Sequence, residues 1–290
     1  MKKSKLLGLA IYLLVYLLAT GCGIGFFFLF RSLDLSLVVN LFLDDVIATV
    51  VVWSMGMLLR SASLYDPYWS MQSVILYLAM LIYYQAFTLG TLLYLGVLIL
   101  YTLRLTGNFV WGFNNLTYVD WRYRMLKEKT GKAYPLVNLL GICLLPTCLV
   151  FLGTVPLIQY VSHGLTFSYY DLIGESIMLG SVILELLSDL QMKSFIRQRK
   201  DHSEVNQVGL WAYSRHPNYF GEVSFWYGVA LVFLLNSKTE IYWITGAILI
   251  TLLFLFISIP MEEKHMLSYK PSYLEYQQKT SVFLILPHRK

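Results

Sequence analysis

Residues 6–30 read LLGLAIYLLVYLLATGCGIGFFFLF, a run without a charged side chain. A helix needs roughly 20 consecutive apolar residues to cross a bilayer, so this run is long enough to do so. It is too long, and too apolar to its end, for a cleaved signal peptide, and no small-x-small cleavage site follows it. The run therefore predicts a retained transmembrane helix.

The rest of the chain has the same character. Its composition is 57% hydrophobic and only 13% charged, and its mean hydropathy is +0.61. A soluble domain carries about 25% charged residues, so a separate soluble domain has little room here. Further apolar runs lie approximately at residues 38–59, 73–88, 90–103, 137–161, 170–188, 219–236 and 241–259. We predict an all-α fold, a polytopic membrane helical bundle of about eight transmembrane helices.

The helix count depends on the runs 73–88 and 90–103, which are short and meet near Gly90, so that they form either a tight hairpin or one long helix. The positions of the basic residues support a count of eight. If the chain starts inside and crosses eight times, all of the 22 Lys and Arg residues except Arg31 and Lys238 lie on the cytoplasmic side. Such a bias sets the orientation of membrane proteins, so we predict that both termini are cytoplasmic.

The net charge of +5 follows from the same bias. No basic helix with interleaved aromatic residues indicates a nucleic-acid surface, so we expect no nucleic-acid partner. The expected surroundings are the lipid bilayer.

Residues 209–222 read GLWAYSRHPNYFGE and place polar side chains between two apolar runs. Polar groups at the edge of a bilayer are costly unless they bind something. Pro217 suits the first turn of a helix, and a helix start favours phosphate. Asn218 and Glu222 then share one helix face, and Arg215 adds a planar fork that can bind phosphate. The pattern indicates a phosphorylated ligand, with His216 either a ligand contact or a structural residue.

The predicted topology brings residues 104–135, 189–222 and 260–290 to one side of the membrane. Simpler explanations stay open: the first segment also suits a solvated loop, and the third an amphipathic tail on the headgroups. Glu185 and Asp189 share a helix face. They are either functional or helix-end carboxylates paired with a nearby Lys or Arg.

Other motifs favour structural roles. The stretch Gly21-Cys22-Gly23-Ile24-Gly25 lacks the βαβ context of a dinucleotide site and predicts close helix packing. The five histidines show no ligand spacing on one helix, so we expect no metal site. The thiols of Cys22, Cys143 and Cys148 lie in apolar runs and are expected to be buried.

Four segments carry a resemblance to a known superfamily. They are ELLSDLQ at 185–191, GLWAYSRHPNYFGE at 209–222, IPMEEK at 259–264 and YLEYQQKTS at 273–281. The chain resembles the steroid 5-alpha-reductase C-terminal-domain superfamily, and most closely its mainly bacterial branch of uncharacterised integral membrane proteins. The segments RLTGN at 104–108, DWRY at 120–123 and YDPYW at 65–69 also resemble that branch.

The resemblance implies a helical membrane enzyme that holds NADPH in a pocket open to the cytoplasm. The enzyme would reduce a carbon–carbon double bond in a lipophilic small molecule of the sterol, polyprenyl or fatty enone type. Residues 1–103 would be N-terminal transmembrane helices on the lipid-substrate side. Residues 104–290 would form the C-terminal domain with the cofactor pocket, and the bacterial branch implies the bacterial cytoplasmic membrane.

The superfamily's site residues carry over position by position. Asn218, Glu222 and Asp189 match its cofactor-contacting Asn, Glu and Asp. The other expected residues of the cofactor pocket match motif positions with less defined roles, namely Arg215, His216, Tyr219, Glu263 and Tyr276. The superfamily's carbonyl-polarising Glu and Tyr do not align here. The intramembrane candidates for catalysis are Asp44, Asp45, Tyr83 and Tyr84, although a lipid-interface position also explains the two tyrosines.

Two other functions fit the sequence. Isoprenylcysteine and phospholipid methyltransferases resemble the same region, with an Arg-His-Pro-x-Tyr run and a later Glu-Glu, and they bind S-adenosylmethionine there. The Asn-Tyr-x-Gly-Glu continuation and the segment 185–191 favour the reductase. The third possibility is a non-enzymatic membrane protein, a transporter or a relative that keeps only the scaffold, although no inverted repeat supports a transporter.

Overall fold

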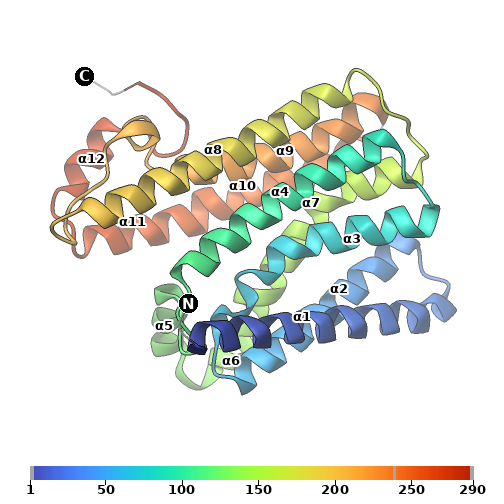
Figure 1. Ribbon diagram of the computed structural model, residues 1–290, viewed down its shortest axis with the longest axis horizontal. Helices are drawn as coiled ribbons and strands as arrows, with labels where there is room; N and C mark the ends of the chain where they lie inside the picture. Colours follow the sequence, from blue (N-terminus) through green and yellow to red (C-terminus); the bar gives the residue numbers. More distant parts are fainter. Residues whose placement is uncertain (1–2, 238–239, 288–290) are drawn as a thin grey trace. The chain divides into compact units, whose positions relative to one another are not determined.

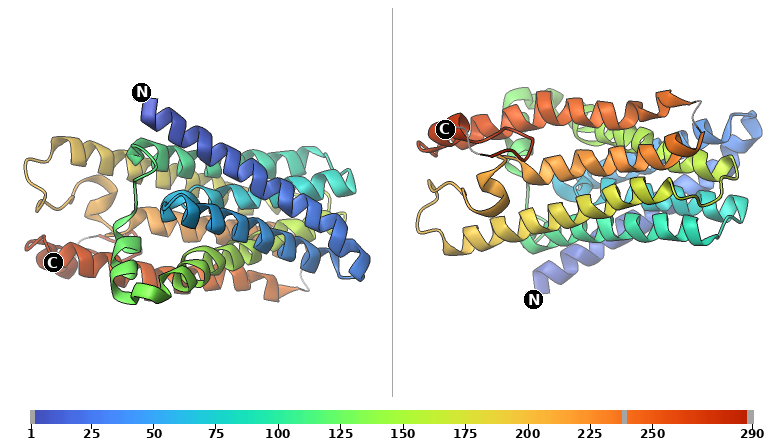
Figure 2. Two further views of the ribbon diagram at one scale, coloured as in Figure 1. Left: turned by 90° about the horizontal axis from the view of Figure 1, so that it is seen from below. Right: turned by 90° about the horizontal axis from the view of Figure 1, so that it is seen from above.

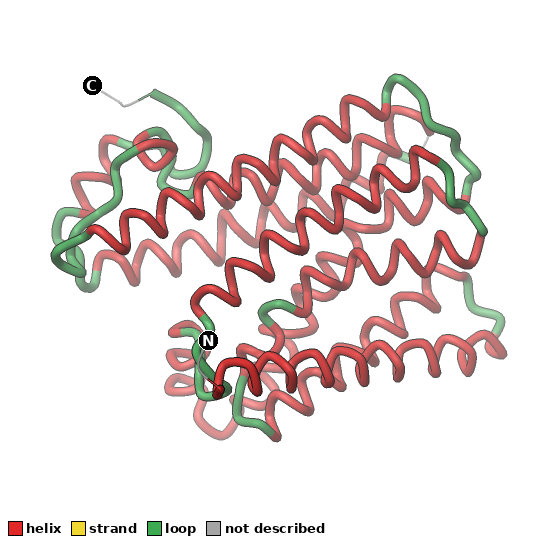
Figure 3. Tube along the Cα trace, in the orientation of Figure 1, coloured by secondary structure: helices red, strands yellow, loops and turns green. Residues whose placement is uncertain are grey.

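The computed structural model describes residues 3–237 and 240–287, and these ranges contain helices and loops without a β-strand (Figure 3). The helices, labelled in Figure 1, are α1 Lys3–Phe30, α2 Leu37–Leu58, α3 Tyr68–Tyr84, α4 Leu89–Gly112, α5 Trp121–Thr130, α6 Tyr134–Val137, α7 Leu145–Ser162, α8 Asp171–Gln198, α9 Pro217–Ser237, α10 Thr245–Leu253, α11 Ile259–Leu267 and α12 Tyr273–Lys279. The predicted all-α class is confirmed.

Within the described residues, 6 helical segments are long and apolar enough to cross a membrane. They are Ser4–Leu33, Leu37–Leu58, Leu89–Gly112, Trp121–Ser162, Pro217–Ser237 and Ile241–Leu267. The prediction of about eight spans also counts α3 and α8. Helix α3 is short, with 17 residues, and α8 has 28 residues but carries acidic side chains along its length. The protein is a membrane helical bundle in which these two helices decide the number of spans.

The chain divides into two compact units, Met1–Ser162 and His163–Lys290, which we call unit 1 and unit 2. The division predicted at residues 103 and 104 separates an expected substrate side from an expected cofactor side. It describes function rather than compactness and stays a prediction.

Unit 1 contains α1 to α7. Helices α3 and α4 are separate and are joined by residues 85–88, so the ambiguous runs near Gly90 form two helices. Gln85 ends α3 with a φ of 51°, and Thr88 begins α4 with a capping box to Thr91. Both devices favour a sharp turn between two helices over one long helix.

Pro146 and Pro260 lie inside long helical segments and are accommodated in the same way. Pro146 is the second residue of α7 and follows a π-helical segment at Asn138–Leu144. Pro260 is the second residue of α11 and follows a π-helical segment at Phe254–Ser258. The wider turns accommodate the missing N–H and the ring of each proline. Pro260 and Glu263 therefore stay within a helix that runs to Leu267, rather than in a tail that leaves it.

Unit 2 is built on the antiparallel pair α8 and α9, which lie side by side in Figures 1 and 2. Glycines let the two backbones meet. A Cβ on Gly174 would lie 2.7 Å from the carbonyl oxygen of Gly228, and a Cβ on Gly221 would lie 2.4 Å from Cγ of Glu185. This register brings Asp189, one helical turn beyond Glu185, to the level at which α9 begins.

The glycine stretch of α1 is also partly explained. Gly23 lies against α2, where a Cβ would be 3.2 Å from the carbonyl oxygen of Asp44. Gly21 and Gly25 have no such neighbour within 4 Å. The predicted close helix packing therefore holds at Gly23.

Candidate functional sites

The first site lies in unit 2, where the side chain of Arg215 joins the start of α9 to two other segments. Its Nε donates to Oε1 of Glu263 over 2.6 Å. Its Nη1 donates to the carbonyl oxygens of Gln277 and Thr280, each over 2.7 Å. The side chains of Arg215 and Glu263 are only 10% and 13% exposed, so the pair is largely shielded from water.

Glu263 accepts hydrogen bonds from two further side chains. Nε2 of His216 lies 3.2 Å from Oε1 of Glu263, and Nε2 of Gln277 donates to Oε2 over 2.8 Å. Because a carboxylate only accepts, His216 carries a proton on Nε2. Its ring stacks on Tyr219, with 5.3 Å between the ring centroids and 9° between the planes.

Residues 276–283, the end of α12 and the segment after it, are hydrogen-bonded to the residues just before α9. Ser214 Oγ donates to the carbonyl of Phe283 over 2.8 Å, and the backbone N–H of Arg215 donates to the carbonyl of Ser281 over 2.9 Å. The hydroxyl of Tyr276 donates to the carbonyl of Trp211 over 2.5 Å. Burial raises the pKa of Tyr276, so its hydroxyl keeps the proton for this bond.

The remaining expected residues lie on α8 and α9. Asp189 and Glu222 are buried, and Oε1 of Glu222 accepts from the indole N–H of Trp226 over 2.9 Å. Asn218 is half-buried, and its side-chain amide has no hydrogen-bond partner within 3–237 and 240–287. Among the expected pocket residues, Asn218 is thus available to a ligand.

The structure adds residues that the sequence did not single out. The backbone carbonyls of Gln277 and Thr280 accept from Arg215. Gln191, which ends the segment 185–191 quoted above, accepts from the backbone N–H of Leu210 over 2.9 Å. The hydroxyl of Thr280 is buried and unpartnered in the described part of the chain. Both Gln277 and Thr280 lie in the segment 273–281, whose resemblance was the available signal.

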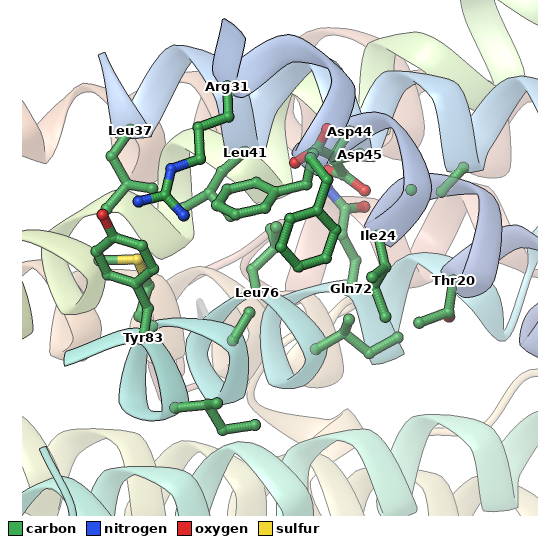
Figure 4. A pocket seen from close by; sticks show the side chains of 18 of the residues that line it. Thr20, Ile24, Arg31, Leu37, Leu41, Asp44, Asp45, Gln72, Leu76 and Tyr83 are labelled. Atoms are coloured by element: carbon green, nitrogen blue, oxygen red, sulfur yellow. The ribbon is translucent and has the colours of Figure 1, made fainter. Parts of the chain in front are cut away.

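The second site is an apolar cavity of about 320 Å³ in unit 1. Helices α1, α2 and α3 form its wall, mostly with aliphatic and aromatic side chains (Figure 4). Its polar lining includes Asp44, Asp45 and Gln72, which lie together in the close-up view, with Arg31 and Tyr83 toward the other end.

Of these polar residues, Asp44, Asp45 and Gln72 are buried. Nε2 of Gln72 donates to Oδ2 of Asp45 and to the carbonyl of Thr147, the latter over 3.0 Å. Oδ1 of Asp44 and Oε1 of Gln72 are buried without a hydrogen-bond partner in the described part of the chain. Two residues of a largely apolar lining therefore carry buried oxygen atoms without a partner in that part of the chain.

Three of the four intramembrane candidates line this cavity. Asp44, Asp45 and Tyr83 contribute to its wall, whereas Tyr84 does not. Tyr84 packs edge-on against Tyr83, with 5.0 Å between the ring centroids, and is 42% exposed. Gln72 was missed because it is a neutral residue on another helix. Across residues 3–237 and 240–287, no three His, Cys, Asp or Glu side chains come together as a metal site.

The apolar helices and the two polar clusters define a polytopic helical membrane protein. The chain belongs to the DUF1295 family, described as a protein of unknown function, whose pattern matches residues 52–280. The match covers every expected cofactor-pocket residue and begins after Asp44 and Asp45. No curated protein and no solved structure matches the chain.

Proposed function

We propose that the protein is a membrane-embedded reductase that uses NADPH to reduce a carbon–carbon double bond in a lipophilic substrate. The resemblance to the steroid 5-alpha-reductase superfamily supplies the activity. The observation that supports it most is the polar cluster at the start of α9. There, Arg215 and His216 are both hydrogen-bonded to Glu263, and the adjacent Asn218 amide is open to a ligand.

The polar groups fit a phosphorylated nucleotide. Helix α9 has 21 residues, and its positive N-terminal end favours phosphate. Arg215 uses Nε and Nη1 within the protein, while Nη2 has no partner in the described ranges. The Nη2 group, the Asn218 amide and the buried hydroxyl of Thr280 supply donors around the start of the helix.

The buried carboxylates suit a different part of the ligand. Asp189 and Glu222 accept hydrogen bonds, as ribose hydroxyls require, and are placed by the register of α8 and α9. NADPH would supply the hydride, while these residues would hold the nucleotide in place. Substrate would reach the site from the bilayer, since a lipophilic enone is poorly soluble outside it.

Ligand-dependent thermal stability tests this proposal. We expect NADPH to raise the melting temperature of the purified full-length protein, because a ligand of the folded state stabilises it. Asn218→Ala should reduce the shift without changing the melting temperature of the free protein. The matched control is Gln278→Ala, an exposed amide in α12, which should leave the shift unchanged.

The same assay separates the alternatives. A shift with S-adenosylmethionine and none with NADPH would replace the reductase by a membrane methyltransferase of the isoprenylcysteine or phospholipid type. No shift with either nucleotide would favour a non-enzymatic membrane protein. Arg215→Lys is a poorer probe than Asn218→Ala, because Arg215 also holds the segments around Gln277 and Thr280.

A further inference from the structure

The unit 1 cavity has a largely apolar lining that includes a few buried polar residues, and this contrast indicates the class of ligand that it binds. Its wall is largely apolar, yet Asp44 and Gln72, which line it, each carry a buried oxygen atom, Oδ1 and Oε1, without a partner in the described part of the chain. Asp44 is 7% exposed and Gln72 is 1% exposed. Leaving such atoms unpaired costs stability, and a ligand that reaches them recovers that cost.

The orientation of the Gln72 amide follows from its neighbours. Its nitrogen faces a carboxylate oxygen of Asp45 and the carbonyl oxygen of Thr147. The Thr147 carbonyl only accepts hydrogen bonds. A flipped amide would set its oxygen against this carbonyl, so Oε1 is the atom left over. The unpaired Oε1 of Gln72 is therefore an acceptor, and the group that completes it is a donor.

The apolar wall and the volume define the rest of the ligand. The cavity of about 320 Å³ lies at the lower end of the roughly 300–1,000 Å³ of small-molecule sites. This room suits one hydrocarbon chain better than a two-chain phospholipid. Side chains such as Ile24, Leu41 and Leu76 line it and offer only apolar contacts.

We propose that the unit 1 cavity binds a single-chain lipid alcohol. Its hydroxyl donates to Asp44 or Gln72, and its chain lies along α1, α2 and α3. A hydroxyl is preferred to a carbonyl, since a carbonyl would bring another acceptor to Oε1 of Gln72. This inference does not rest on nucleotide binding in unit 2, and its test contains no nucleotide.

The experiment uses the full-length protein in phospholipid nanodiscs and a diazirine-bearing analogue of dodecanol as photoreactive probe. Unlabelled dodecanol and dodecyl methyl ether compete with it. The ether keeps the chain and the oxygen but has no proton to donate. We expect dodecanol to compete at a concentration lower by about tenfold, as for a hydrogen bond to a buried acceptor. Crosslinked peptides should come from α1, α2 or α3.

Variants locate the binding. Asp44→Val should abolish the preference for the alcohol over the ether. Ala79 lines the cavity and is exposed, so Ala79→Phe should block labelling without disturbing the core. The neighbouring Leu78 does not line the cavity, and Leu78→Phe should leave labelling unchanged. The Ala79 and Leu78 variants keep the test decisive if Asp44→Val fails to fold.

Three outcomes would overturn the proposal. Equal competition by the alcohol and the ether would show a merely apolar cavity. Labelling that persists in Ala79→Phe would place the probe elsewhere. Competition by dodecylamine at concentrations far below those of dodecanol would assign the cavity to a cationic lipid instead.

Discussion

The guanidinium of Arg215 and the carboxylate of Glu263 form a shielded ion pair, 2.6 Å between Nε and Oε1, that joins the start of α9 to α11. These residues are separated by 48 positions in the sequence. Removing one member of a shielded pair leaves the other charge uncompensated, which costs more than the pair contributes.

We therefore predict that Arg215→Ala lowers the free energy of unfolding by about 3–5 kcal/mol. Arg215→Lys should lose less, because it keeps the charge but not the planar fork. The control is Lys279→Ala, which breaks an exposed pair with the same 2.6 Å separation from Glu275 and should have no measurable effect. Thermal unfolding in detergent measures all three, and equal stability of the Arg215 and Lys279 variants would contradict the prediction.

The glycines of α8 give a second prediction. A Cβ on Gly174 would lie 2.7 Å from the carbonyl oxygen of Gly228 and 2.9 Å from the backbone nitrogen of Val232, so Gly174→Ala should force α8 and α9 apart. Gly180 on the same helix has no neighbour within 4 Å. Gly180→Ala should raise stability by about 0.5–1 kcal/mol through helix propensity. Melting temperatures check whether Gly174→Ala lowers the stability and Gly180→Ala raises it. A Gly174→Ala variant as stable as the parent protein would disprove the close contact.

The predicted orientation can be tested with single cysteines. Arg199 follows α8 on the expected cytoplasmic side, and Tyr169, which is 89% exposed, precedes α8 on the expected outer side. A membrane-impermeant thiol reagent should label Tyr169→Cys in intact cells and Arg199→Cys only in inverted vesicles. The reverse pattern would invert the topology and remove the cytoplasmic location from the proposed cofactor site.

We predict that the stability of the protein depends on pH through the buried carboxyl group of Asp66. It lies between α2 and α3, accepts a hydrogen bond from the Tyr123 hydroxyl, and burial raises its pKa from 3.8 to about 7. The folded protein then keeps a proton that the unfolded chain releases, so stability falls as the pH rises from about 4 to about 7. Asp66→Asn should remove this part of the dependence. Melting temperatures of the two proteins across that range check it, and parallel curves would show that Asp66 does not titrate differently on folding.

The helices were predictable because each apolar run is a local signal. The runs at 6–30 and 38–59 match α1 and α2 closely, since burial in lipid requires length and apolarity and little else. The end of the last long helix was placed too early. Charged residues after Pro260 look like an exit from the membrane, but the π-helical turn before the proline lets the helix continue.

The sites were only partly predictable, because their contacts are distant in the sequence. The motif residues Arg215, His216 and Glu263 do come together. No local pattern reveals that Gln277 and Thr280 bind the same guanidinium. Gln72 was equally hidden, since its importance depends on Asp45 and Thr147 meeting it from other helices.

The glycine contacts between α8 and α9 have a mechanical consequence for unit 2. Two backbones that touch at Gly174, Gly221 and Gly228 leave no space in which the helices can slide past one another. Asp189 and Asn218 therefore sit on a rigid wall. Residues 276–283 are held to residues 211–215 by individual hydrogen bonds, which break one at a time. If the proposed nucleotide enters this site, we expect that segment to move while the paired helices stay fixed.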